Sequence, residues 1–199
     1  VHRRGELMQQ AVGEGDGAMA AIVGLDDYQI HDICAAVAGD DIVSAANFNS
    51  PGQTVIAGSK AAVERAMVAS KEAGAKRALP LKVSVPSHCA LMKPAAERLA
   101  GELADIEFRT ATTPIIQNVN AQIARAADEI KTNLIDQLYK PVLWVDSIKL
   151  MQSSGIGILI ECGPGKVLCG LVKRIAPEIS CFGSDDPGSL QQARDEVVD

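Results

Sequence analysis

One histidine stands where a β-like stretch gives way to residues that can begin a helix. It is His88, which follows the segment 83–87 and precedes the segment 89–94. A histidine at such a junction can face a cleft, and its ordinary pKa of about 6.5 lets it exchange a proton near neutral pH. The alternative is a structural histidine that caps the helix. The residue types around His88 therefore make it a candidate general base.

Two neighbouring signals are weaker. Cys89 adjoins His88, but side chains adjacent in sequence usually point apart, which disfavours a cysteine nucleophile activated by this histidine. The segment Gly163-Pro164-Gly165-Lys166 lacks the spacing of a phosphate-binding loop, and no Ser or Thr follows its lysine. We interpret it as a tight turn into a helix.

Composition restricts the class of protein. The chain has 199 residues, of which 47% are hydrophobic and 22% charged, as in globular proteins. A net charge of −6 argues against bulk nucleic-acid binding, and no apolar run is long enough to cross a membrane. We expect a cytoplasmic protein that binds neither nucleic acid nor membrane.

The five cysteines are scattered along the chain without Cys-x-x-Cys spacing, and only three histidines are present. This pattern favours reduced thiols over disulfides and predicts no metal site. The cysteines are Cys34, Cys89, Cys162, Cys169 and Cys181.

The elements that must position His88 begin with a compact unit before it. Hydrophobic alternation, the candidate helix cap Asp26 and the turn Ser50-Pro51-Gly52 indicate the element order βαββαβ. This order predicts a ferredoxin-like subdomain over residues 15–84. Its strands are expected at 18–25, 42–48, 54–57 and 78–85.

The remainder of the chain is α/β in character. A strand is expected at 114–119 and a buried strand at 157–161, and Pro141 is expected to start a helix. The polar tail from Gly183 is expected to be mobile.

Several segments agree, in order and spacing, with one known family. They are 83–94 around His88, 47–58 (NFNSPGQTVIAG), 76–81 (KRALPL) and 161–168 (ECGPGKVL). The chain resembles malonyl-CoA:acyl carrier protein transacylases up to about Ile175. The resemblance implies a partial α/β-hydrolase-like core, with a first helix at 1–14 and a C-terminal part at 85–199, into which the ferredoxin-like subdomain is inserted.

The resemblance also implies roles for three residues. His88 would activate a serine nucleophile, and the main-chain carbonyl of Gln137 would hold the imidazole in the correct tautomer. Arg4, in the segment Arg4-Gly5-Glu6-Leu7-Met8-Gln9, would bind the malonyl carboxylate through two parallel donors. The alternatives are an exposed helix arginine beside Arg3 and a solvated glutamine at a helix end.

The nucleophile of the family lies in a Gly-x-Ser-x-Gly sequence, which this chain does not contain. The chain starts at Val1 in what reads as the middle of a helix, so we expect it to be cut from something longer. The serine and the oxyanion loop would lie either in a complementary N-terminal fragment or in residues that precede Val1. We expect the chain alone to be inactive.

The function implied by the resemblance is transfer of malonyl from coenzyme A to the phosphopantetheine thiol of acyl carrier protein, the acyl-loading step of fatty acid synthesis. No bound cofactor is expected. Two basic pairs could dock the acidic carrier protein, although such pairs are more often solvated surface charges. They are Lys76 with Arg77 and Lys173 with Arg174.

A second hypothesis comes from another class. The chain could be a non-catalytic fragment or a protein-interaction module whose ferredoxin-like unit presents a binding surface. The absence of the Gly-x-Ser-x-Gly sequence that holds the nucleophilic serine favours this hypothesis, whereas the presence of both Arg4 and His88 counts against it.

Overall fold

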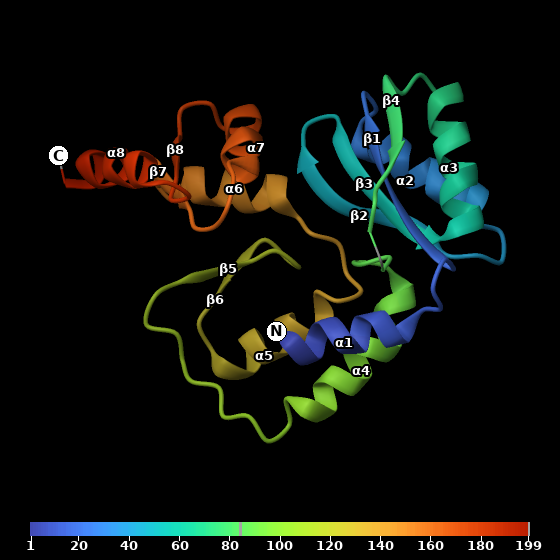
Figure 1. Cartoon of the computed structure of the whole chain (residues 1–199), viewed down its shortest axis with the longest axis horizontal. Coiled ribbons are helices and arrows are strands. Elements are labelled where there is room, and N and C mark those ends of the chain that lie inside the picture. The colour runs from blue at the N-terminus through green and yellow to red at the C-terminus, as the bar shows by residue number, and fades with distance from the viewer. Residues whose placement is uncertain (84, 199) are drawn as a thin grey trace. The chain divides into compact units, whose positions relative to one another are not determined.

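The computed structural model describes residues 1–83 and 85–198. It divides into two compact units, Val1–Trp144 and Val145–Asp199 (Figure 1). Every residue singled out as a catalytic or malonyl-binding candidate lies in the first unit.

The first unit contains a four-stranded antiparallel sheet with the strand order β2-β3-β1-β4. Two helices join its strands, so the element order along the chain is βαββαβ, as predicted. The elements are β1 (Gly17–Val23), α2 (Asp27–Ala38), β2 (Val43–Ser50), β3 (Gln53–Ser59), α3 (Lys60–Glu72) and β4 (Arg77–Pro80).

Local sequence explains the ends of these elements. Asp26 caps α2, because its carboxylate accepts the Gln29 N–H at 2.7 Å while the Gln29 side chain accepts the Asp26 N–H at 3.1 Å. Gly52 has a φ of +69° in the turn between β2 and β3, a conformation that glycine adopts without steric cost. The predicted cap and turn are therefore confirmed.

The sheet is apolar on both faces. Helices α2 and α3 cover one face (Figure 1), where Ile22, Ile30 and Val63 join one buried cluster. On the other face, Met19 and Val55 join a second cluster that includes Cys89. The strand period of two sends alternate side chains of β1 to opposite faces, so the sheet also supports the segment that carries His88.

Helices form the rest of the first unit. The helix α1 (His2–Ala11) lies beside α4 (Lys93–Glu102), as Figure 1 shows. The two share a buried cluster that includes Leu7, Met92 and Leu138. The other elements are the 3₁₀ turn η1 (Ala90–Met92), the hairpin β5 (Ile115–Gln117) and β6 (Gln122–Ala124), and α5 (Ala127–Asp136).

Most of the second unit consists of five elements, of which β7 and β8 form a parallel pair. In order they are α6 (Trp144–Ser153), β7 (Ile158–Glu161), α7 (Val167–Ile175), β8 (Ser180–Gly183) and α8 (Pro187–Val198). The first residue of α6 still belongs to the first unit.

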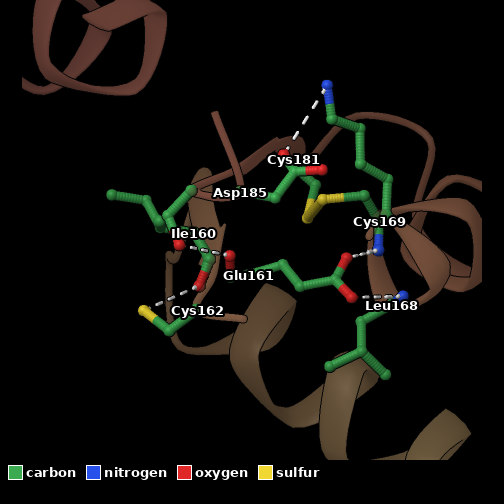
Figure 2. The surroundings of a disulfide bond; sticks show 9 residues. Ile160, Glu161, Cys162, Leu168, Cys169, Cys181 and Asp185 are labelled. Atoms are coloured by element: carbon green, nitrogen blue, oxygen red, sulfur yellow. Dashed lines mark hydrogen bonds and ion pairs between the residues drawn. A yellow bond between two sulfur atoms is a disulfide. The ribbon is translucent and has the colours of Figure 1, made fainter. Parts of the chain in front are cut away.

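A disulfide in the second unit corrects the prediction that the thiols are reduced. Cys169 on α7 and Cys181 on β8 are bonded, and their Cα atoms lie 5.2 Å apart (Figure 2). Sequence separation hid this pairing, because the fold brings together two cysteines without characteristic spacing. Cys34, Cys89 and Cys162 are free.

The same region is braced by Glu161 at the end of β7. Its carboxylate accepts the main-chain N–H groups of Leu168 at 3.1 Å and Cys169 at 2.9 Å (Figure 2). A negative charge at the first turn of a helix satisfies free N–H groups and opposes the positive end of the helix dipole. The disulfide and the Glu161 cap therefore tie α7 to both strands.

Two predicted boundaries were wrong. The strand expected at 78–85 ends at Pro80, which cannot donate to a ladder, and Ser84 lies outside the described residues. Pro141 does not start a helix, because the next residue pairs with β2 instead. The Val142 N–H donates to the Ala46 carbonyl at 2.8 Å, and the Val142 carbonyl accepts the Phe48 N–H at 2.9 Å.

The tail after Gly183 contains an element that the sequence did not predict. It is the helix α8, which begins there because Asp186 accepts the Ser189 N–H at 2.9 Å and Pro187 suits a first helical position. Within the described residues, no helix is long and apolar enough to cross a membrane, and no group of three or more potential metal ligands is present.

Candidate active site

His88 is held at two points by one turn of the chain. Its main-chain N–H donates to the carbonyl of Leu138 at 2.9 Å, and its ring Nδ1 lies 2.7 Å from the carbonyl oxygen of Gln137. A carbonyl oxygen can only accept, so this contact places the ring proton on Nδ1. The neutral ring then has Nε2 as its proton-accepting nitrogen, as a general base requires.

The backbone of His88 is strained. Its φ is +63°, a left-handed conformation that is uncommon for residues other than glycine. Such a conformation persists where the surrounding structure fixes it, and it is found most often at functional sites. Here the Leu138 carbonyl fixes it on one side and the buried residue Cys89 on the other.

Cys89 serves as an anchor rather than as a nucleophile. Its side chain is 1% exposed, packs against the sheet and donates through Sγ to the Pro86 carbonyl at 3.2 Å. Burial raises the pKa of the Cys89 thiol to about 11, although an interaction with the Leu91 main chain opposes this. A thiol with so high a pKa is a poor nucleophile at neutral pH.

The carbonyls that hold His88 belong to the C-terminal end of α5. Gln137 is the C-cap of this helix, and the last carbonyls of a helix have no partner within it. They are therefore free to accept from His88. The negative end of the helix dipole also favours the positive charge that the imidazole gains when it takes a proton.

Arg4 lies on α1 and differs from its neighbour in its contacts. The Arg3 guanidinium pairs with Glu102 on α4 and with Glu6. Within residues 1–83 and 85–198, no carboxylate is recorded as a partner of Arg4, and its Nε is buried without a hydrogen-bond partner. Arg4 is half-buried, and this burial lowers its pKa.

Electrostatics links Arg4 to His88. Burial of the ring is the largest cause that lowers the pKa of His88, and the positive charge of Arg4 lowers it further. The carbonyls of Gln137 and Lys140 act in the opposite direction, but the pKa of His88 stays below its ordinary value. This lowered pKa favours the neutral form of His88, which is able to accept a proton.

The structure therefore brings Arg4, His88 and Gln137 into one site built by α1, the segment before η1 and the end of α5. The two basic pairs are exposed and lie in different units, Lys76 with Arg77 in the first and Lys173 with Arg174 in the second.

Sequence reasoning missed part of this site. It did not single out Leu138, whose carbonyl holds the His88 backbone, or Asp136, whose carboxylate binds the side chains of Tyr139 and Lys140. The sequence did offer one signal for Asp136. Tyr139 and Lys140 follow it by three and four residues, the spacings at which side chains of a helix can contact each other.

Comparison with known proteins agrees with this arrangement. The family model described as acyl transferase domain matches residues 1–176. The chain therefore belongs to the acyl transferase domain family.

Two relatives with the same name illustrate the similarity. The chain is 54% identical over 193 residues to the malonyl CoA-acyl carrier protein transacylase of Escherichia coli (strain K12), covering 97% of this chain and 62% of that protein. It is 44% identical to the enzyme of the same name from Bacillus subtilis (strain 168), with 97% and 61% covered. The predicted resemblance is confirmed, and the chain spans about three fifths of the length of these relatives.

Solved structures show the same likeness. The acyl carrier protein S-malonyltransferase of Vibrio cholerae is 55% identical, with a TM-score of 0.94 over 96% of this chain and 63% of that one. A malonyl-transacylase solved in complex with a type II PKS acyl-carrier protein is 53% identical, with a TM-score of 0.95 and coverages of 97% and 62%.

Proposed function

We propose that this chain carries the general base and the carboxylate clamp of a malonyl-CoA:acyl carrier protein transacylase. The single observation that carries the proposal is the 2.7 Å contact between His88 Nδ1 and the Gln137 carbonyl, near Arg4, whose Nε is buried without a hydrogen-bond partner among the described residues. The named relatives support the choice of malonyl, coenzyme A and acyl carrier protein as substrates.

His88 acts in both halves of the transfer. In the first, its Nε2 takes the proton of a serine hydroxyl as the oxygen attacks the thioester, and the imidazolium then returns the proton to the departing coenzyme A sulfur. In the second, it takes the proton of the phosphopantetheine thiol and returns it to the serine oxygen. The Gln137 carbonyl, at the C-terminal end of α5, stabilises the imidazolium between these steps.

Arg4 selects the acyl group. Its half-buried guanidinium can donate two parallel hydrogen bonds to the malonyl carboxylate, whereas acetyl would leave the buried charge unpaired. We therefore expect Arg4→Lys to raise the KM for malonyl-CoA, because an ammonium cannot reproduce the two-point contact.

The serine is proposed to come from a polypeptide segment outside these 199 residues. The parallel pair β7–β8 supports this, since parallel sheets are normally covered on both faces, yet Ile160 on β7 is 42% exposed. The chain by itself is then inactive.

The architecture implied by this assignment is also a proposal. The βαββαβ unit has the strand order of a ferredoxin-like subdomain, and we propose that it is inserted into an α/β-hydrolase-like core formed by residues 1–14 and 85–199. A cytoplasmic location without a bound cofactor, and docking of the acidic carrier protein by the two basic pairs, belong to the same proposal.

The test is malonyl transfer from malonyl-CoA to phosphopantetheinylated carrier protein, measured with the chain alone and with an added fragment that bears the serine. Turnover that appears with the fragment and is lost with His88→Ala supports the enzyme. Stable binding of carrier protein without turnover would support the protein-interaction module instead.

A further inference from the structure

The carbonyls that hold His88 lie on a short turn whose side chains also form a network. Asp136 ends α5, and its carboxylate accepts from the Tyr139 hydroxyl at 2.6 Å through Oδ1 and from Lys140 Nζ at 2.7 Å through Oδ2. Gln137 and Leu138, which hold His88, lie between Asp136 and these two partners. We propose that Asp136 is a positioning residue that fixes this turn and thereby the orientation of His88; the inference rests on the function proposed above.

The main chain of the turn also depends on Asp136. The Asp136 carbonyl accepts the N–H groups of Tyr139 at 3.1 Å and Lys140 at 2.9 Å. The same two residues are therefore bound twice by Asp136, once through its main chain and once through its side chain. This double attachment restrains the peptide groups of Gln137 and Leu138, which lie inside it.

The two arms of the carboxylate have different surroundings. Tyr139 packs against the buried cluster that contains Leu7 and Leu138, so its hydroxyl ties Asp136 to the α1–α4 core. Lys140 is half-exposed and immediately precedes Pro141, where the chain leaves the turn. The Asp136 side chain is 19% exposed, which shields its hydrogen bonds better than those of an open surface pair.

The turn needs such support because no side-chain carboxylate is recorded as a hydrogen-bond partner of His88 within the described residues. Main-chain carbonyls take that role, and a carbonyl cannot be re-aimed by a change of rotamer, only by rotation of its peptide group. The strained φ of His88 likewise depends on the Leu138 carbonyl. Small displacements of a catalytic base are costly, so a residue that holds the turn affects the rate without contacting substrate.

The experiment compares Asp136→Ala and Asp136→Asn with Asp128→Asn, a matched change of charge at an exposed position in the first turn of the same helix. Two quantities are measured. The first is the ¹⁵N spectrum of the His88 ring in the chain alone, which reports the tautomer without any turnover. The second is kcat and KM in the transfer assay with the serine-bearing fragment.

We expect Asp136→Ala to lower kcat by about tenfold to 100-fold with little change in the KM for malonyl-CoA, and to mix the two ring tautomers of His88. Asp136→Asn keeps an acceptor for Tyr139 and should recover part of the loss. Asp128→Asn should leave both quantities unchanged.

Two outcomes would overturn the inference: a His88 spectrum in Asp136→Ala that matches the unmodified chain, or a fall in kcat equal to that caused by Asp128→Asn. If Asp136→Ala does not fold, Tyr139→Phe removes one arm without a change of charge and is judged by the same ring spectrum. Because that spectrum needs no turnover, absence of transfer when the chain without substitutions is combined with the serine-bearing fragment would refute the proposed function without deciding the role of Asp136.

Discussion

The main-chain N–H of His88 donates to the carbonyl of Leu138 at 2.9 Å, and the ring Nδ1 of His88 lies 2.7 Å from the carbonyl oxygen of Gln137, the residue before Leu138. Two consecutive carbonyls thus fix both the backbone and the imidazole of one residue. The tautomer and the strained φ of His88 therefore share a cause, and a change in the turn alters both.

The side chain of Gln137 should matter little, because its carbonyl belongs to the main chain. We expect Gln137→Ala to keep kcat within about twofold, whereas His88→Ala should lower it by about 100-fold or more through loss of the base. Steady-state transfer assays measure both. A loss of activity in Gln137→Ala as large as that in His88→Ala would show that the side-chain amide of Gln137, and not its main-chain carbonyl, is needed for transfer.

The titration of His88 tests the electrostatics of the site. Burial and the charge of Arg4 keep its pKa below 6.5, so its NMR titration midpoint should lie below that value. Removing the nearby positive charge with Arg4→Gln should raise the midpoint. The control is Arg3→Gln, because Arg3 is adjacent to Arg4 on α1 but pairs with Glu102. This substitution should not raise the titration midpoint of His88.

The same shift predicts how stability depends on pH. Because the folded pKa of His88 is lower than the unfolded value of about 6.5, the unfolded chain binds the proton more readily. This contribution to stability is fully present above pH 6.5 and is lost as the pH falls through the folded pKa. Urea unfolding from pH 7.5 downwards should show that loss, and His88→Gln should reduce it. An unchanged pH dependence in His88→Gln would contradict the assignment.

Substitution of Cys89 should leave the transfer activity intact but lower the stability of the fold. Cys89→Ala should retain transfer in the reconstituted assay, while lowering the free energy of unfolding by about 1 kcal/mol through lost packing against Met19 and Val55. Alkylation by iodoacetamide at pH 7.5 should be slow at Cys89 and faster at the exposed Cys162. Rapid, inactivating modification of Cys89 would contradict its role as an anchor.

The disulfide should stabilise the second unit. Closing a loop between Cys169 and Cys181, 12 residues apart, stabilises by about 3 kcal/mol in the chain-entropy model. Reduction with dithiothreitol, or Cys169→Ala with Cys181→Ala, should lower the midpoint of unfolding. The control is Cys34→Ala, which removes a free thiol. Comparing its midpoint of unfolding with that of the double substitution separates the effect of the disulfide from the effect of losing a cysteine side chain. An unchanged midpoint after reduction would mean that the Glu161 cap alone secures α7.

Sequence by itself determined the local elements and the chemical types in the site. The capping box at Asp26, the turn at Gly52 and the period-two alternation of β1 all follow from short-range preferences, so the βαββαβ order could be predicted. The spacing around His88 marked a base for the same reason.

Tertiary structure decided how the parts meet. Leu138 and the bond between Cys169 and Cys181 took their roles from a main-chain group and from a contact between residues separated in the chain. A main-chain carbonyl is common to every residue, so no sequence pattern can show which one accepts from His88. Likewise, Arg3 and Arg4 are the same residue type. The packing of α1 against α4 gives Arg3 a carboxylate partner, whereas the Nε of Arg4 is buried without a hydrogen-bond partner among the residues that the structure describes.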